Sequence, residues 1–169
     1  MKYTEDGSEL ISVSKNLKSC EIKIKEGTRI IGTEAFGNCC SLHSVVIPRG
    51  VTAIGIRAFE NCRSLQKVII PDSVTEIGCS AFKNCSSLRS VVPPEIKEST
   101  FLLKNVTKIG NNAFYGCTSL PETIPPLNRV TEIGDYAFVD TSLKTVYIPN
   151  KAAIISDKAF PEDTEIIQY

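Results

Sequence analysis

The sequence has no tryptophan, a single methionine and a single histidine, and its 19 basic residues balance 19 acidic ones. A balanced charge removes the usual electrostatic basis for binding nucleic acid or an anionic membrane surface. The chain also lacks the run of roughly eighteen apolar residues that a membrane-spanning helix requires. Residues 1–7 contain no apolar stretch of the kind found in a secretory signal, so either the protein is made without one or the sequence begins after it.

The short motifs of common enzyme classes are missing as well. There is no Gly-x-Gly-x-x-Gly, no Walker sequence and no paired-histidine motif. His43 would need a nucleophile and an orienting acid to act in a triad, yet it occupies a place held elsewhere in the chain by Gln66 and Arg89. We therefore predict no enzyme activity, no cofactor and no metal site, and an enzyme that uses His43 is the weakest alternative.

What the sequence does contain is an internal repeat. Hydrophobic residues make up 42% and charged residues 22% of the 169 positions, which is typical of one folded domain. Within it the pair Ala-Phe recurs with steps of 23, 23, 32, 24 and 22 residues. The pairs are Ala35-Phe36, Ala58-Phe59, Ala81-Phe82, Ala113-Phe114, Ala137-Phe138 and Ala159-Phe160. Such a period indicates a solenoid of stacked coils.

The same residues surround most of these pairs. An Ile-Gly pair comes ahead of Ala-Phe, a cysteine follows the phenylalanine by three residues, and a leucine comes next. The cysteines are Cys39, Cys62, Cys85 and Cys117, with Thr141 at that place in the following coil. One coil cannot bury its own apolar side, so the repeated Ile, Phe, Cys and Leu are predicted to point inward and stack from coil to coil.

Each coil also contains a short alternating segment that ends in proline, for example Val45-Val46-Ile47-Pro48. Alternation of β-branched residues predicts a strand, which the proline ends because it has no N–H to donate. The Ala-Phe-x-x-Cys segment is too short for an independent helix, and we expect one helical turn on the far side of the coil. The recurrent glycine predicts a turn with positive φ or a place of close packing.

The pattern Val-Thr-x-Ile-Gly-x-x-Ala-Phe-x-x-Cys-x-Ser-Leu-x-x-Val-x-Ile-Pro resembles the BspA-type leucine-rich repeat. The resemblance implies a leucine-rich-repeat solenoid of the α/β repeat class. Its right-handed coils would carry a parallel β-sheet on one face and short helical turns or a second strand row on the other. Residues 1–169 would form one domain: an N-terminal hairpin or cap (1–27), the repeats (28–160) and a closing strand (161–169).

Members of that family commonly lie on bacterial cell surfaces, or occur in some protozoa, and bind host or matrix proteins or other cells. The resemblance therefore implies a non-enzymatic protein-binding module on the cell surface or secreted, with a cytoplasmic location as the alternative. We expect a protein partner, no nucleic acid and no membrane span. The alternative function is a structural segment of a longer repeat array, so the chain is expected to be a monomer or an end-stacked oligomer.

Two stretches break the repeat. The step of 32 residues places an insertion near 94–103, predicted to leave the coil as a loop that packs or binds through Phe101, Leu102 and Leu103. Residues 120–126 carry prolines where a strand should pair, so any strand there should be short. The final segment, Glu165 to Tyr169, is predicted to be a closing strand with no polar cap, which would favour a longer parent protein or pairing with another chain.

Seven cysteines raise the question of a metal site or disulfides. The four in the repeat form a line, whereas zinc needs ligands that converge on one point. Stacked rungs about 4.7–4.9 Å apart also suit a disulfide poorly, so these cysteines are predicted to fill core space. Cys20, Cys40 and Cys79 occupy polar places and should be exposed. Asparagines precede three of the core cysteines, and their side chains are expected to bond free backbone groups; they are Asn38, Asn61 and Asn84.

The alternation of each strand predicts a binding surface. If Val45 and Ile47 point inward, Val46 points outward, and the equivalent places in other coils line up beside it. The predicted surface is an apolar row with a basic rim, together with the insertion: Val46, Ile69, Val92 and Tyr147, flanked by Lys67, Arg89 and Lys144, and Phe101. Apolar bands with polar rims mark protein interfaces, although β-branched residues also favour strands whose outer face meets only solvent.

Overall fold

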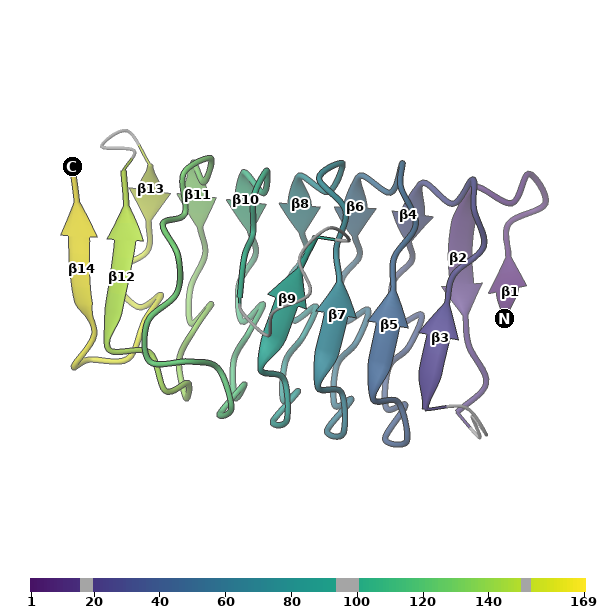
Figure 1. Cartoon of the computed structure of the whole chain (residues 1–169), viewed down its shortest axis with the longest axis horizontal. Helices are drawn as coiled ribbons and strands as arrows, with labels where there is room; N and C mark the ends of the chain where they lie inside the picture. Colours follow the sequence, from purple (N-terminus) through teal and green to yellow (C-terminus); the bar gives the residue numbers. More distant parts are fainter. Residues whose placement is uncertain (16–19, 94–100, 150–152) are drawn as a thin grey trace.

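The computed structural model describes residues 1–15, 20–93, 101–149 and 153–169. It is a β-solenoid of about six turns, in which each coil rises along one face and returns along the other (Figure 1). Followed from the N-terminus, the coils wind in a right-handed sense (Figure 1). A leucine-rich-repeat-like stack with parallel sheets is therefore the architecture of this chain, as the spacing of Ala-Phe predicts.

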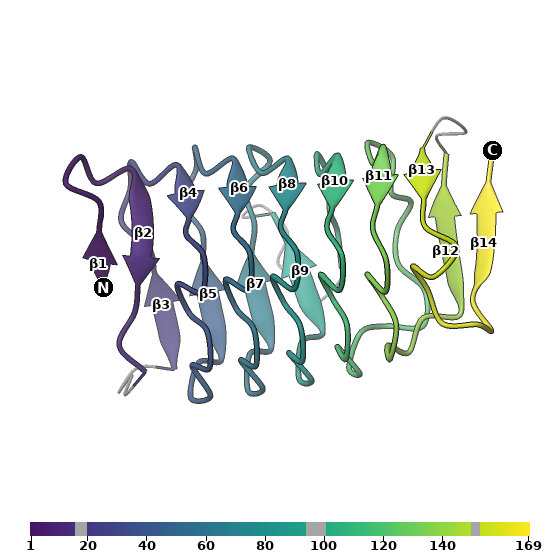
Figure 2. The same cartoon turned by 180° about the vertical axis from the view of Figure 1, so that it is seen from behind.

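The back sheet has eight strands within the described residues and is seen face-on in Figure 2. Its order is β1 (Lys2–Tyr3), β2 (Glu9–Ser12), β4 (Ile30–Ile31), β6 (Ala53–Ile54), β8 (Glu76–Ile77), β10 (Lys108–Ile109), β11 (Glu132–Ile133) and β13 (Ile154–Ile155). All neighbours pair in parallel except β1, which forms an antiparallel hairpin with β2. The hairpin loop is longer than the two-residue turn typical of Asp-Gly, because the Thr4 N–H bonds the carbonyl of Glu9.

Strands on the opposite face form two separate groups (Figure 1). The front sheet consists of β3 (Glu21–Lys23), β5 (Ser44–Val46), β7 (Lys67–Ile69) and β9 (Ser90–Val92), all parallel. The end sheet consists of β12 (Thr145–Ile148) and β14 (Glu165–Gln168), also parallel. Among the described residues between the two sheets, two isolated bridges occur, Val91 to Phe101 and Thr123 to Thr145.

The Ala-Phe-x-x-Cys segments are not helical, so the predicted helical turns and the α/β class are wrong. No helix occurs among the described residues. Each segment is a series of tight turns. In five of the six segments two residues adopt positive φ, which ends a right-handed helix. Around Ala35-Phe36 these are Glu34 (φ 56°) and Asn38 (φ 61°). The N–H of Phe36 bonds the carbonyl of Ala58 in the next coil, so the turns form a third ladder.

Close packing, rather than positive φ, explains the glycine of each Ile-Gly pair. A Cβ built on Gly78 would lie 2.9 Å from the carbonyl carbon of Gly55 and 2.9 Å from the carbonyl oxygen of Ile54. Real Cβ atoms do not approach backbone so closely, and any larger residue would force neighbouring coils apart. Of the two roles that the sequence left open for this glycine, the structure therefore supports close packing.

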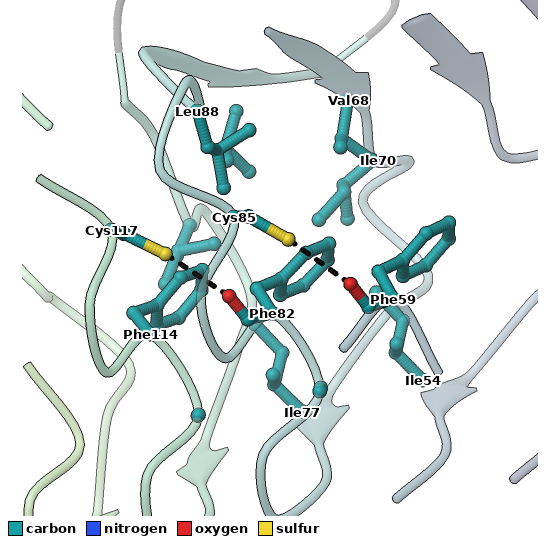
Figure 3. Close-up of a cluster of buried hydrophobic side chains, with 14 of the residues drawn as sticks. Ile54, Phe59, Val68, Ile70, Ile77, Phe82, Cys85, Leu88, Phe114 and Cys117 are labelled. Atoms are coloured by element: carbon teal, nitrogen blue, oxygen red, sulfur yellow. Dashed lines mark hydrogen bonds between the residues drawn. The ribbon is translucent and has the colours of Figure 1, made fainter. Parts of the chain in front are cut away.

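The core is a continuous stack of the repeated residues. Six phenylalanine rings lie face to face with neighbouring centroids 4.7–5.2 Å apart and planes within 12° of each other. Figure 3 shows three of them, with the isoleucine and cysteine side chains of the same coils beside them. Five of the six rings are fully buried and Phe160 is 7% exposed. Burying one such side chain contributes roughly 1.5–3 kcal/mol, which makes the ladder a main source of stability.

The insertion predicted near 94–103 falls partly outside the described residues, at 94–100. From residue 101 onward, Phe101 forms a parallel bridge with Val91, and the Leu102 N–H donates to the carbonyl of Val91. This end of the insertion therefore adds a rung beside β9. It is held to the preceding coil, because Lys104 Nζ lies 2.6 Å from Asp72 Oδ2 and Asn105 Nδ2 donates to the Asp72 carbonyl.

Candidate binding surface

The outer face of the front sheet carries two rows of side chains that follow from strand register. Val46 lies beside Ile69, and both face outward because Val45 and Val68 point into the core with no exposed surface. In the parallel row, Ser44 lies beside Lys67. These register pairs place one apolar row and one polar row side by side on the face of the solenoid, as the alternation in the sequence predicts.

The N-terminal part of the predicted surface is present. Val46, Lys67 and Ile69 are each half-buried, and Arg89 is exposed. The guanidinium of Arg89 donates to Gln66 Oε1 at 2.7 Å, which holds the cation at the edge of the sheet. We define the front patch as Val46, Ile69, Lys67 and Arg89. It is a small apolar centre with two cations on its border.

Val92 and Phe101 do not lie on this exposed surface, because the structure buries both side chains, contrary to the outward position that the sequence predicts for them. Val92 continues the register of Ile69 but has no exposed surface, and its neighbour Ser90 is only 1% exposed. Phe101 is 1% exposed and packs edge-on against Phe114 at 5.3 Å between centroids. Its ring fills core volume beside the phenylalanine stack. The insertion therefore contributes packing here, and a buried side chain is not available to a partner.

Tyr147 and Lys144 lie apart from the front patch. Tyr147 is half-buried on β12, in register with Ile167 of β14 rather than with any strand of the front sheet. The predicted continuous row from Val46 to Tyr147 is therefore interrupted. Lys144 Nζ lies 2.9 Å from Asp163 Oδ2, and this contact raises the pKa of Lys144 and lowers the pKa of Asp163. Both groups are exposed, so solvent weakens the pair.

Two outward residues of β3 extend the front patch and were not predicted. Lys23 lies beside Val46, and Glu21 lies beside Ser44. Both are exposed. The repeat spacing contains the signal that could have found them, because each stands 23 residues before its partner. No Ala-Phe pair precedes β3 in the sequence, which conceals this register.

The repeated cysteines are core residues, and their burial raises the pKa of their thiols. The thiols of Cys85 and Cys117 donate to the carbonyls of Phe59 and Phe82 in the preceding coils, each at 3.1 Å (Figure 3). Burial raises the pKa of Cys62 to about 12, and it also raises the pKa of Cys117. All seven cysteines are free, and the three at polar places are exposed as predicted; these are Cys20, Cys40 and Cys79.

Other candidates for chemistry have local structural roles. His43 is exposed, and its Nδ1 lies 2.9 Å from the Ser41 carbonyl. Asn61 Nδ2 donates to Asn38 Oδ1, and Asn84 Nδ2 donates to Asn61 Oδ1. These amides bond one another instead of the predicted backbone groups. Among the residues that the structure describes, no three His, Cys, Asp or Glu side chains are placed to hold a metal ion.

Parallel strands, stacked coils and inward ladders define a β-solenoid of the leucine-rich-repeat kind. The chain belongs to the family described as "BspA type Leucine rich repeat region", which matches in six copies over residues 12–102 and 95–168. Proteins with this repeat and fold are generally non-enzymatic binding scaffolds. The comparison with curated proteins finds no match.

Several solved structures of bacterial proteins have the same fold. The leucine-rich-repeat protein TpLRR of T. pallidum is 30% identical with a TM-score of 0.69, over 86% of this chain and 66% of that one. A leucine-rich cell surface protein of Faecalibacterium prausnitzii is 28% identical with a TM-score of 0.65, over 99% and 52%. The pneumococcal vaccine antigen PcpA, at 20% identity and a TM-score of 0.78 over 98% and 40%, shares the fold. The chain thus spans 40–66% of the length of these proteins.

Proposed function

We propose that this chain is a non-enzymatic module that binds a protein partner through the outer face of its front sheet. The observation that carries the proposal is the register of Val46 and Ile69, two partly exposed apolar side chains on neighbouring strands. Lys67 and Arg89 border them, and Lys23 extends the cationic border. An apolar centre with a polar rim has the composition of a protein interface. The excess of cations over Glu21 on this rim favours a partner with an acidic surface.

The test is a surface-capture assay with a panel of immobilised extracellular-matrix proteins and of whole cells. We expect Ile69→Asp to reduce capture at least tenfold, because it places a carboxylate in the apolar centre. The front row accommodates a charged side chain at Lys23, so the variant should fold. Ile56→Asp on the opposite side is the matched control. Ile56 is 50% exposed and Asp135 occupies its place in a later coil, so capture should be unchanged.

Equal capture by Ile69→Asp and the parent protein would overturn the front patch as the binding surface. The cationic rim also predicts that capture in the same assay depends on salt concentration. Capture should weaken as salt rises, because exposed charges are screened within about 8 Å at physiological ionic strength. Capture that is independent of salt would remove the rim from the proposal and leave only the apolar centre.

A location on the cell surface or in the secreted fraction is part of the same proposal. It is supported by the family match and by the similarity to a protein named as a cell surface protein. In the described ranges of the chain, no helix is sufficiently long and apolar to cross a membrane. Antibody labelling of intact source cells, compared with permeabilised cells, tests this location, and labelling only after permeabilisation would contradict it.

A second candidate function is a structural segment whose end stacks on another coil. Ile154 on β13 is 74% exposed and Ile166 on β14 is 44% exposed, and Ile166 lies in register with the fully buried Val146. A hollow of about 570 Å³ at this end is lined in part by Ile155, Phe160 and Ile166. Light scattering over a range of concentrations tests stacking. A chain that stays monomeric at every concentration argues against it.

A further inference from the structure

The register of the front sheet places a cysteine beside the single histidine of the chain. The carbonyl of Cys20 accepts the N–H groups of His43 and Ser44, and the carbonyl of His43 accepts those of Gln66 and Lys67 in the same way. Cys20 and His43 therefore hold the same place in neighbouring coils. They come immediately before β3 and β5, which lie side by side (Figure 1). Both side chains are exposed, and we call them the cysteine–histidine pair.

Side chains at this place reach from one coil to the next. Beyond His43 the row continues with Gln66 and Arg89, whose side chains are joined by a hydrogen bond of 2.7 Å. Neighbouring strands of a parallel sheet lie about 4.7–4.9 Å apart. The thiol of Cys20 and the imidazole of His43 have the same relationship as Gln66 and Arg89. The two exposed side chains can therefore turn toward a common point between the coils.

The imidazole of His43 is oriented for coordination through Nε2. Its Nδ1 lies 2.9 Å from the carbonyl oxygen of Ser41. A carbonyl oxygen can only accept a hydrogen bond, so Nδ1 is the donor, and in the neutral ring Nε2 keeps its lone pair. Metal-binding histidines have this arrangement, in which a carbonyl accepts from one ring nitrogen and fixes the tautomer while the other nitrogen binds the ion.

We propose that Cys20 Sγ and His43 Nε2 bind a Zn²⁺ ion at the start of β3 and β5. Thiolate sulfur and imidazole nitrogen suit zinc, whereas Mg²⁺ and Ca²⁺ prefer oxygen ligands. With Zn–S of about 2.3 Å and Zn–N of about 2.0 Å, the two ligand atoms of a tetrahedral ion lie roughly 3.5 Å apart. Side chains from adjacent strands can reach that separation. The ion binds the thiolate, so the Cys20 proton passes to solvent as the Zn–S bond forms.

The cysteine–histidine pair supplies two of the four ligands of a tetrahedral ion. Within the described residues no group of three His, Cys, Asp or Glu side chains is placed to hold a metal, so water completes the coordination. A structural zinc site is closed by four protein ligands, and we expect this chain to fold equally well without the ion. The sequence predicts no metal site because Cys20 and His43 stand 23 residues apart, outside any short ligand motif.

The other two exposed cysteines have no histidine in the neighbouring coil. Cys40 Sγ lies 3.7 Å from the carbonyl oxygen of Asn61, and Arg63 takes the place of Cys40 in that coil. Cys79 lies on the turn ladder, where Asn111 takes its place in the next coil. Neither an arginine nor an asparagine side chain is a usual zinc ligand. Cys40 and Cys79 are therefore internal controls for Cys20.

The test adds ZnCl₂ to the reduced, metal-free chain and follows maleimide labelling of each exposed cysteine by peptide mass spectrometry. We expect saturating Zn²⁺ to slow labelling of Cys20 at least tenfold, because the coordinated thiolate is no longer a free nucleophile. The labelling rates of Cys40 and Cys79 should stay unchanged, and Mg²⁺ at the same concentration should protect none of the three. His43→Gln should abolish the protection, and it should fold because Gln66 occupies this place in the next coil.

Calorimetric titration of ZnCl₂ gives a second readout. Cys20→Ser and His43→Gln should each raise the Kd for Zn²⁺ at least tenfold, whereas the matched control Cys79→Ser should keep the Kd of the parent. Ile69→Asp, which tests the front patch, should also keep the parent Kd. The zinc site and the proposed function can therefore fail separately, because no residue of the front patch is a ligand.

Labelling of Cys20 at the same rate with and without Zn²⁺ would overturn the inference. Full protection of Cys20 in the His43→Gln variant would overturn it as well, because the histidine would then play no part. If Cys40→Ser raises the Kd and Cys20→Ser does not, another pair of residues holds the ion and the inference is wrong.

Discussion

The thiol of Cys85 donates to the carbonyl oxygen of Phe59 at 3.1 Å, joining two neighbouring coils through their buried side (Figure 3). The same oxygen accepts the N–H of Cys62 within its own coil. Cys62 repeats the relationship with Phe36, also at 3.1 Å. The repeated cysteine therefore fills volume and adds one bond between successive coils. That hydrogen bond explains why the repeated cysteine position suits a small side chain with a hydrogen-bond donor.

Replacing this donor should cost a measurable part of the stability. We expect Cys85→Ala to lower the free energy of unfolding by about 1–3 kcal/mol, through lost burial and the lost thiol bond. The loss should stay moderate because the Phe59 carbonyl keeps its backbone partner. Cys85→Ser, which retains a donor of similar size, should recover part of it. Urea unfolding followed by circular dichroism measures both, and a Cys85→Ala curve that overlays the parent curve would contradict the packing role.

Thiol labelling should divide the seven cysteines into two classes. The thiolate is the reactive form, and burial raises the pKa of Cys39, Cys62, Cys85 and Cys117, which keeps these thiols protonated near pH 8. We expect a maleimide to label the exposed Cys20, Cys40 and Cys79 rapidly in the folded chain, and all seven after denaturation. Mass spectrometry of the native reaction counts the adducts. Rapid labelling of a fourth site without unfolding would contradict the burial of the ladder.

Phe101 should behave as a core residue. Its ring packs edge-on against Phe114 and also lies 6.4 Å from Phe138, so Phe101→Ala leaves a large cavity. We expect a loss of about 3–5 kcal/mol in the free energy of unfolding. Leu102→Ala is the control, since Leu102 is adjacent but half-buried and should cost much less. Equal losses in the free energy of unfolding for the two variants, measured by thermal and urea unfolding, would contradict the burial of Phe101 in the core.

Gly78 should tolerate no side chain. A Cβ there would lie 2.9 Å from three backbone atoms of the preceding coil, so we expect Gly78→Ala to cost about 1–3 kcal/mol. Gly37→Ala is the matched control, because the nearest atom would be 3.3 Å away and Glu60 and Lys83 occupy its place in later coils. Its effect should stay within about 0.5 kcal/mol. Identical melting temperatures for the two variants would refute close packing as the reason for the repeated glycine.

Part of the candidate surface could be predicted from the alternation of single strands. Val46, Ile69 and Lys67 lie where the pattern puts them, because adjacent coils with equal spacing pair in register. The pattern fails at Val92, whose outward position is buried, and at Tyr147, which belongs to another sheet. Both failures lie next to the irregular coils at 94–103 and 120–126. There the number of residues per coil changes, and position in the repeat no longer fixes position in space.

By itself the sequence determined the period of the repeat, and with it the stacking of Phe, Cys and Leu. Apolar residues at equal spacing can be buried only if neighbouring coils pack in register. Tertiary structure decided that the Ala-Phe-x-x-Cys segment is a chain of turns. Residues such as Glu34 adopt positive φ against their local preference, because bonds to the next coil compensate the strain. It also decided that Phe101 faces the core, since only the assembled stack creates the space that its ring fills.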